Sequence, residues 1–232
     1  MEGIRNVDWL KVRESLDDHG FAHVKNVLSR EMCEGIVRLY IDEKLFRSTI
    51  NMQRYRFGLG EYKYFSYPLP PMIQGLREGF YQPLVSIAND WMRRLSIDTI
   101  YPAELKKFLS LCHSKDQQRP TPLMLHYETN GYNTLHQDIY GEVYFLFQVV
   151  FMLTGSGKDF EGGELVFVEQ LPRAQSRAEV VNPGQGDAVI FTTNFRPVNG
   201  AKGYYRAKMK HGVSRVKKGM RYTMGLIFHD AA

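Results

Sequence analysis

Three side chains of the types that hold a transition metal are the most informative feature of this sequence of 232 residues. His136 and Asp138 are separated by a single residue, and His211 follows much later in the chain. Two imidazoles and one carboxylate on one side of a metal leave its other positions open, as in non-haem Fe(II) oxygenases. Arg221, shortly after His211, has a planar guanidinium that can hold a carboxylate through paired hydrogen bonds. The pattern therefore predicts an iron centre beside a site for a 2-oxo dicarboxylic acid.

Strands are the elements that must position these ligands. Side chains alternate between the two faces of a strand, so a strand over residues 204–211 places His211 on the side of Met209. The opposite side then holds a row of cations, namely Arg206, Lys208 and Lys210. The same alternation places His136 and Asp138 on one face. We expect all three ligands to point into the interior of a rigid β-structure, which is the support that a preorganised metal site needs.

The chain changes character near Pro120, where short runs rich in β-branched and aromatic residues begin, separated by glycine- and proline-containing turns. The predicted strands span residues 123–128, 133–137, 143–154, 165–170, 178–181, 188–193, 204–211 and 221–229. About eight such strands are typical of a double-stranded β-helix, or jelly roll. The expected fold class is α+β, with an N-terminal helical layer packed on the jelly roll. We expect a single domain over residues 1–232, in which 1–119 form a mainly helical support and 120–232 the catalytic core.

The first half of the chain contains apolar residues at helical spacing. Asp8 is a plausible cap for the first such run, and Gly20 ends it. Residues 21–27 are predicted as a short strand. A further helix is expected to begin near Pro83, and another to follow Pro102.

Four further motifs follow one another in order around the predicted ligands. They are residues 160–165 (FEGGEL), 183–191 (PGQGDAVIF), 211–213 (HGV) and 219–222 (GMRY). With Tyr127 ahead of His136, this order resembles the Fe(II)- and 2-oxoglutarate-dependent dioxygenase superfamily, in particular its prolyl-hydroxylase-like branch. The resemblance covers roughly residues 120–230, and it rests on the motifs jointly, because a His-x-Asp triplet alone is common.

The resemblance implies a set of roles. It implies that the iron ligands, and thus the catalytic residues, are His136, Asp138 and His211. It also implies that Arg221 binds the distal carboxylate of 2-oxoglutarate, with the hydroxyl of Thr223 on the same face and the phenol of Tyr127 as a further cosubstrate contact. In such enzymes 2-oxoglutarate and O2 are converted to succinate and CO2 while a C–H bond of the substrate is hydroxylated, with ascorbate as the reductant in assays.

The substrate is open between several classes. The full-length pattern resembles bacterial oxygenases assigned by similarity to oxidative demethylation of damaged DNA, so an alkylated nucleobase in single-stranded DNA is one prediction. Ile227, however, stands six residues after Arg221, where alkylated-DNA repair dioxygenases of the AlkB type have a second arginine. A protein side chain or a small metabolite is the alternative substrate. A non-catalytic metal-binding jelly roll, of the cupin kind or derived from an oxygenase, is the alternative outside enzymes.

Residues 53–67, within a possible substrate lid near 50–70, mix aromatic residues, cations and glycines. As a lid, their rings would stack on an unpaired base while Arg54, Arg56 and Lys63 contact phosphates. As a glycine-hinged loop or hairpin, their rings would pack on the core. Both interpretations remain open from the sequence.

Composition limits location and partners. The net charge of +5 allows an anionic partner without requiring one. No apolar run approaches the roughly 18 residues that span a bilayer, so no membrane segment is predicted. Cys33 and Cys112 are the only cysteines, which favours reduced thiols and a cytoplasmic protein. The remaining histidines have no partner at a useful spacing and are expected to be ordinary: His19, His23, His113, His126 and His229.

Overall fold

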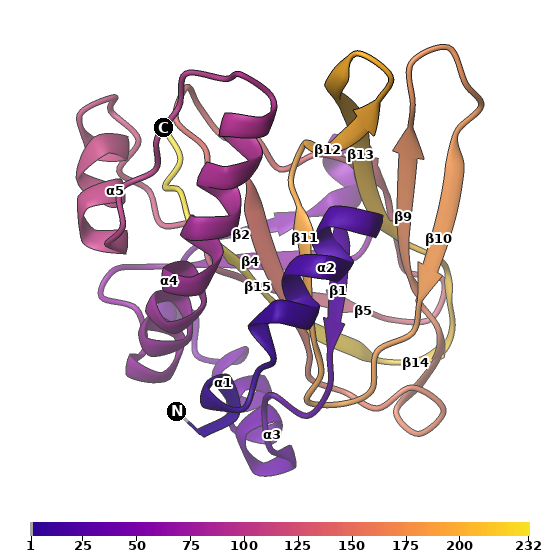
Figure 1. Ribbon diagram of the computed structural model, residues 1–232. Helices are drawn as coiled ribbons and strands as arrows, with labels where there is room; N and C mark the ends of the chain where they lie inside the picture. The colour runs from indigo at the N-terminus through magenta and orange to yellow at the C-terminus, as the bar shows by residue number, and fades with distance from the viewer. Residues whose placement is uncertain (1) are drawn as a thin grey trace.

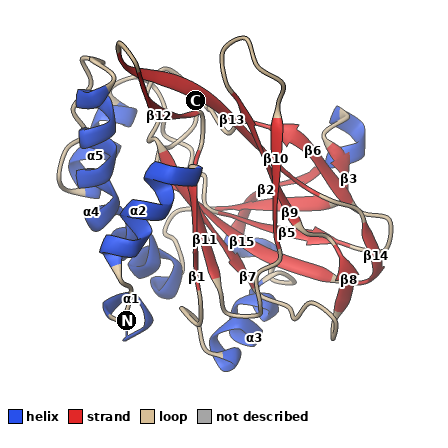
Figure 2. Cartoon of the chain, turned by 45° about the vertical axis from the view of Figure 1, so that its right-hand side comes forward, coloured by secondary structure: helices blue, strands red, loops and turns tan. Residues whose placement is uncertain are grey.

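The computed structural model describes residues 2–232, which form two main antiparallel sheets and a layer of helices (Figure 1). The helices α2, α4 and α5 lie together on one side of the strands, on the left of the view in Figure 2. This arrangement confirms the predicted α+β class, a jelly roll with a helical layer packed on it. No helix among the described residues is both long and apolar enough to cross a membrane.

The larger sheet has the strand order β1-β11-β7-β15-β5-β4-β2. Its strands are β1 (Phe21–Val24), β2 (Phe46–Asn51), β4 (Glu61–Phe65), β5 (Leu123–Tyr127), β7 (Phe147–Met152), β11 (Ala188–Thr192) and β15 (Arg221–Ile227). The interior strand β7 is buried except at Val150, which is half-buried. Phe147 and Phe151 pack on helix α4, whereas Gln148 and Val150, which alternate with them, line a cavity on the other face.

The smaller sheet has the strand order β10-β9-β13-β6-β3, and β12 pairs with β13. Its strands are β3 (Gly58–Leu59), β6 (Tyr132–His136), β9 (Leu165–Gln170), β10 (Arg177–Val181), β12 (Phe195–Gly200) and β13 (Gly203–Val213). A separate two-stranded sheet joins β8 (Phe160–Gly162) to β14 (Val216–Gly219). All eight strands predicted after Pro120 are present, β9 with the predicted bounds and the others with shifted ends. The three that the sequence did not predict there, β8, β12 and β14, lack a clear apolar alternation.

The helices are α1 (Glu2–Arg5), α2 (Trp9–His19), α3 (Arg30–Leu39), α4 (Pro71–Arg94) and α5 (Leu105–His113), with 3-10 helices η1 (Glu43–Leu45) and η2 (Met52–Tyr55). The predicted cap of α2 is confirmed, because the Asp8 side chain accepts from the Lys11 N–H and Gly20 ends the helix at a φ of 77°.

The prediction that a helix begins near Pro83 is wrong. The helix α4 begins at Pro71, and Pro83 lies inside it. Proline is favoured in a first turn, where its missing N–H is not needed, but it usually breaks a helix interior. Here buried side chains on both sides of Pro83, from Ile73 to Trp91, pack on the larger sheet and hold the helix together across the missing hydrogen bond.

The first half of the chain also supplies strands to the larger sheet. The strand β2 pairs with β4, and β4 pairs with β5 of the second half. This pairing agrees with the hairpin interpretation of residues 53–67, although one buried position of β4 is a lysine. Lys63 is only 5% exposed, and its ammonium donates to the Tyr40 carbonyl and the Glu43 carboxylate.

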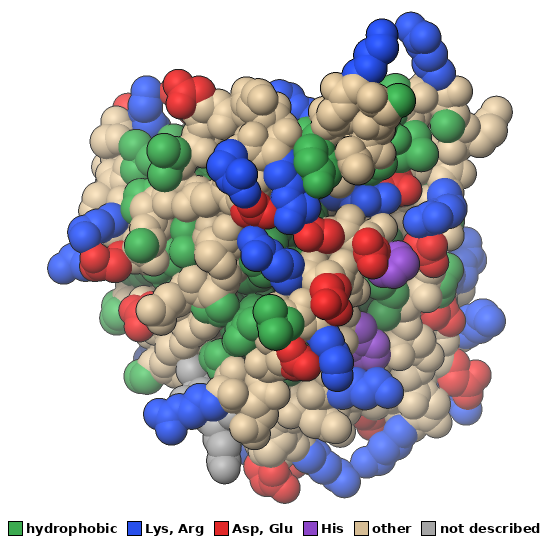
Figure 3. Space-filling model, viewed as in Figure 1, with side chains coloured by type: hydrophobic (Ala, Val, Ile, Leu, Met, Phe, Trp, Pro, Cys, Tyr) green, Lys and Arg blue, Asp and Glu red, His purple; other side chains and the backbone are tan. Residues whose placement is uncertain are grey.

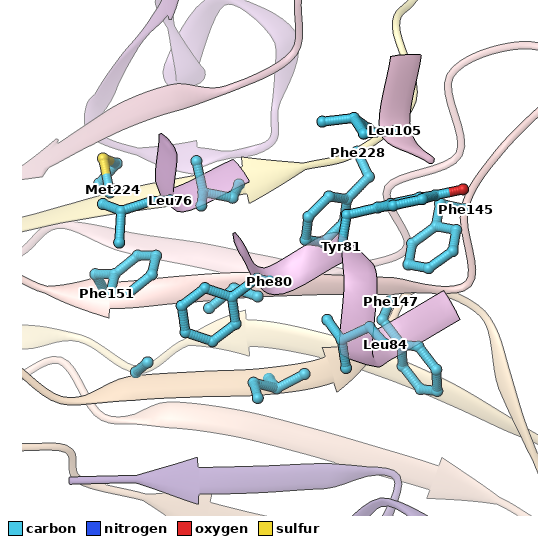
Figure 4. Packing of buried hydrophobic residues seen from close by; sticks show 14 of the residues in the cluster. Leu76, Phe80, Tyr81, Leu84, Leu105, Phe145, Phe147, Phe151, Met224 and Phe228 are labelled. Atoms are coloured by element: carbon cyan, nitrogen blue, oxygen red, sulfur yellow. The ribbon is translucent and has the colours of Figure 1, made fainter. Parts of the chain in front are cut away.

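An aromatic core joins the helical layer to the larger sheet (Figure 4). Phe80 of α4 meets Phe151 edge-to-face, with ring centroids 5.5 Å apart. Tyr81 packs on Phe145 at 4.8 Å and lies beside Phe228, just beyond the end of β15. This packing fixes the position of the strands β7 and β15 behind the cavity.

Candidate metal centre and cosubstrate pocket

The three predicted metal ligands converge in the structure. His136, the last residue of β6, is paired directly with His211 of β13, and Asp138 follows in the next loop. The Asp138 Oδ2 is 3.2 Å from His211 Nε2, and its Oδ1 is 3.5 Å from His136 Nε2. One ligand atom from each residue lies within 4.8 Å of the other two. Two imidazole nitrogens and a carboxylate at this separation fit the donor set of a divalent transition metal.

The strand alternation expected around His211 is present. Met209 and His211 are buried on the inner side of β13. The cations on the opposite side, Arg206, Lys208 and Lys210, are exposed. Because the inner side also holds the cavity, the ligand is aimed inward by the strand itself.

Hydrogen bonds orient the ligands further. His136 Nδ1 lies 2.7 Å from the Thr134 carbonyl, to which it can only donate, so its Nε2 lone pair faces the other ligands. The Tyr140 hydroxyl donates to Asp138 Oδ1 at 2.5 Å. Gln137 donates to the carbonyls of Asn194 and Met209 at 2.8 Å each, which ties the loop between the ligands to the neighbouring strand.

Electrostatics favour the metal-binding forms of Asp138 and His211. Burial opposes the charge of Asp138, but the hydrogen bond and charge of His211, the charge of His136 and the Tyr140 hydroxyl hold the pKa of this carboxyl well below its usual range. Burial and the neighbouring His136 lower the pKa of His211. An ionised carboxylate beside a neutral imidazole is what a cation requires of its ligands.

The three candidate ligands line a cavity of about 200 Å³ between the two sheets. The same cavity is lined by the three residues predicted to bind the cosubstrate, which are Tyr127, Arg221 and Thr223. The strands β5 and β15 bring them together, because Arg221 is paired directly with Tyr127 and Thr223 lies two residues further on the same face. All six predicted site residues therefore lie around one space.

Arg221 is fully buried, and none of its three guanidinium nitrogens has a hydrogen-bond partner among residues 2–232. The guanidinium lies 5.5 Å from the centre of the Tyr127 ring, whose hydroxyl also has no partner there. Burial lowers the pKa of Arg221 to about 10, which leaves it charged at neutral pH. A buried, unpaired cation is costly, so this end of the cavity fits an anion such as a carboxylate.

Two residues of the site were not predicted. Tyr140 contacts the carboxylate of Asp138, and its position two residues later is the only sequence signal for it. Gln148 is 3% exposed, lines the cavity and has an amide nitrogen without a partner among the described residues. A polar residue within the apolar run of β7 is the signal that could have identified Gln148, since an interior strand otherwise excludes such a side chain.

The other histidines lie outside this centre. His23 contacts Asp187 at 2.7 Å, and His113 contacts Asp230 at 2.9 Å. The ring of His126 stacks on Tyr222, away from Tyr127 as its strand parity predicts. Residues 2–232 contain no second group of three side chains placed to hold a metal.

Residues 53–67 divide between the two predicted interpretations. Tyr64 and Phe65 are buried in β4, and buried Lys63 cannot contact a phosphate, so the lid interpretation is wrong for this part. Tyr55 and Phe57 are exposed, and Phe57 lines the mouth of the metal cavity.

Solved structures with the same architecture are 2-oxoglutarate–Fe(II) oxygenases. An oxidoreductase of the 2OG-Fe(II) oxygenase family from Burkholderia pseudomallei superposes with a TM-score of 0.60 at 13% identity, covering 98% of this chain and 94% of the other. A Trichoplax adhaerens prolyl hydroxylase, solved with a hypoxia inducible factor peptide, gives 0.58 at 15% identity, covering 97% and 90%. A Pseudomonas putida prolyl-4-hydroxylase gives 0.56 at 11%, covering 97% and 99%. The fold is that of the 2-oxoglutarate- and Fe(II)-dependent oxygenases.

Sequence comparison identifies the branch. A model of the family Oxygenase-NA, described as an oxygenase catalysing oxidative methylation of damaged DNA, matches residues 60–231, and the chain belongs to this family. Two uncharacterized Mycobacterium tuberculosis proteins, MT2286 of strain CDC 1551 / Oshkosh and Rv2227 of strain ATCC 25618 / H37Rv, are each 45% identical to it over 168 residues, which is 72% of this chain and 72% of theirs.

Proposed function

We propose that His136, Asp138 and His211 hold Fe(II), and that Arg221, Thr223 and Tyr127 hold 2-oxoglutarate in the adjoining part of the cavity. The bound iron, with 2-oxoglutarate and O2, supplies the oxidation of a substrate C–H bond while the cosubstrate becomes succinate and CO2. The observation that carries this proposal is one cavity that is lined both by a metal donor set and by an unpaired buried guanidinium.

The protein residues supply binding, orientation and exclusion of water. The guanidinium of Arg221 gains the carboxylate partner that it lacks, and the Thr223 hydroxyl lies on the same face to donate a further hydrogen bond. Apolar side chains such as Leu125, Val150 and Leu165 line the same cavity. Their low polarity strengthens both charged interactions and keeps bulk water from the reacting centre.

We propose an alkylated base of DNA as the substrate. The family description names damaged DNA, and the cavity wall above the ligands is formed by the rings of Tyr62, Tyr64 and Tyr140. Flat aromatic walls without charged groups suit a planar base. Hydroxylation of a protein side chain is the second candidate, favoured by the overall likeness to prolyl hydroxylases.

The two cysteines support a cytoplasmic location. Cys33 and Cys112 are both free and buried. Unpaired thiols are typical of a reducing compartment.

The reaction can be tested by following 2-oxoglutarate with Fe(II), ascorbate and O2. We expect succinate to form with the wild-type protein and not above the protein-free rate with His136→Ala, because that variant lacks one ligand. Equal succinate formation by both proteins would contradict the site. Methylated single-stranded DNA, a proline-containing peptide and a metabolite mixture are then compared for stimulation. Stimulation by the peptide alone would replace the DNA proposal by the second candidate.

A further inference from the structure

An exposed aromatic pair, Tyr55 and Phe57, lies next to the metal cavity, and Phe57 lines that cavity. Their segment is held beside β6, which ends at His136, because β3 pairs with β6. We call these two residues the aromatic rim. Exposed aromatic side chains next to a cavity are typical of a binding surface.

Two rings of the rim are already stacked. Tyr55 and Phe57 lie 5.6 Å apart between ring centroids at an angle of 18°. They remain 57% and 45% exposed, and Phe57 also lines the cavity. A parallel pair with this much free surface can take a further flat ring, and stacking of that kind is how proteins hold unpaired bases.

The loop that presents these rings is fixed rather than free. Met52 is fully buried, and its N–H donates to the Gly60 carbonyl at 3.0 Å, which joins the ends of the loop. The Phe57 carbonyl accepts from both the N–H and the hydroxyl of Thr134, at 2.8 Å and 2.7 Å. The 3-10 helix η2, which forms the first part of this loop, lies beside β3 and β6 in Figure 2. A preorganised surface loses little conformational freedom when a ligand binds.

Two exposed cations alternate with the rings of the rim. Arg54 and Arg56 are both exposed, and residues 53–59 contain no acidic residue. On the face shown in Figure 3, by contrast, acidic and basic side chains are interspersed. Rings and cations in alternation match the alternation of bases and phosphates along a single strand.

We propose that the aromatic rim docks a single-stranded nucleic acid, with Tyr55 and Phe57 stacking on a base that neighbours the one in the cavity. Arg54 and Arg56 bind the flanking phosphates. This inference rests on the proposed action on DNA bases, and it names the surface that selects an unpaired strand. An extended peptide on the same surface is the outcome that would replace it.

The test is equilibrium binding of a labelled single-stranded oligonucleotide, measured by fluorescence anisotropy. The protein is loaded with Mn(II) and 2-oxoglutarate, so that it binds without turnover. We expect Phe57→Ala and Tyr55→Ala each to weaken binding about tenfold, as for the loss of one base–ring stack. In Arg54→Gln/Arg56→Gln, the slope of log affinity against log salt should become less negative by about 1.4, because each phosphate contact contributes about 0.7.

Matched controls separate the rim from general effects. Tyr204→Ala removes another exposed tyrosine, and Lys25→Gln/Arg38→Gln removes another pair of exposed cations, so both should bind like the wild type. An oligonucleotide of abasic sites should abolish the difference between Phe57→Ala and the wild type but keep the effect of the arginine variant. Unchanged thermal unfolding checks that each variant is folded.

Several results would overturn the proposal. Wild-type affinity of Phe57→Ala for the normal strand would remove the stacking role, and an unchanged salt slope would remove the phosphate role. Displacement of the oligonucleotide by polyglutamate at equal charge would show that the rim binds any polyanion. Succinate formation without rim-dependent DNA binding would overturn the rim and leave the iron chemistry standing. Rim-dependent binding without succinate formation would overturn the iron chemistry and leave the rim standing.

Discussion

At the scale of single residues, two buried arginines show what the site requires. Arg77 and Arg221 are both fully buried. The guanidinium of Arg77 donates to the Asp230 carboxylate at 2.9 Å and to the carbonyls of Ile227 and Phe228. That of Arg221 has no partner among the described residues, although it also lies in the interior. A buried charge without a partner is costly, so the contrast supports the proposal that Arg77 is structural and that Arg221 binds an anionic ligand.

This contrast predicts opposite effects of the same substitution. Without 2-oxoglutarate, Arg221→Met should be as stable as the wild type or up to about 4 kcal/mol more stable, because it removes an unpaired buried charge. Arg77→Met should be destabilised by about 3–5 kcal/mol, because it removes the buried cation paired with Asp230 and leaves that carboxylate only the Tyr67 hydroxyl and His113. In the presence of metal, 2-oxoglutarate should raise the melting temperature of the wild type and not that of Arg221→Met. Urea and thermal unfolding measure both effects, and a ligand shift retained in Arg221→Met would remove Arg221 from the site.

The sequence allows the chemically distinctive residues to be predicted and not those that support them. The metal ligands and Arg221 belong to types that are rarely brought together for other reasons. Tyr140 and Gln148 are of types that occur in any core, and only the fold shows that they reach the cavity. Their roles depend on contacts between segments far apart along the chain.

At the scale of elements, a short sheet beside the cavity determines where Arg221 lies. Gly163 follows β8 with a φ of +65°, a left-handed conformation that favours glycine. A Cβ at this position would lie 2.9 Å from Arg221 Cδ and 3.0 Å from a methyl group of Val216. The glycine in the FEGGEL motif therefore makes room for the arginine side chain.

Adding that methyl group should affect the cosubstrate and not the metal. Gly163→Ala is expected to displace the guanidinium and to raise the 2-oxoglutarate concentration needed for half-maximal succinate formation, while metal affinity is kept. The matched control is Gly157→Ala, which has a similar φ of +79° but no atom within 4 Å of its added Cβ. Both variants carry the same backbone strain of about 1–2 kcal/mol, so only the steric effect differs. An equal change in both would assign the effect to strain alone.

Elements were predictable where one periodicity dominates. The strands β9, β11 and β15 are rich in buried apolar residues, and their predicted ranges nearly coincide with the observed ones. The start of helix α4 was predicted wrongly, because Pro83 conflicts locally with a helix that tertiary packing stabilises. For residues 53–67 the sequence permits both a lid and a hairpin, and the strand β4 agrees with the hairpin. An element forms against the local propensity of one residue when burial of the residues on both sides stabilises it by more than that residue destabilises it.

At the scale of the whole molecule, the helical layer and the sheets together form and support the cavity. The helix α4 packs on β7 and β15, which form the back wall of the cavity, while β6 and β13 carry the ligands opposite. The jelly-roll class follows from the number and spacing of strands. The extension of the larger sheet by β2 and β4 does not, because it depends on the pairing of β4 with β5 across a long stretch of chain. A rigid wall on each side is what keeps three distant ligands within reach of one ion.

The most direct test is the stoichiometry of Fe(II) binding by anaerobic equilibrium dialysis. The wild-type protein is expected to bind one ion per chain, and His136→Ala, Asp138→Ala and His211→Ala are each expected to lose that site. His23→Ala is the control, because His23 also contacts a carboxylate, at 2.7 Å from Asp187, but lies outside the centre, so it should bind like the wild type. Full binding by the three ligand variants, or no stoichiometric binding by the wild type, would contradict a metal centre at these residues.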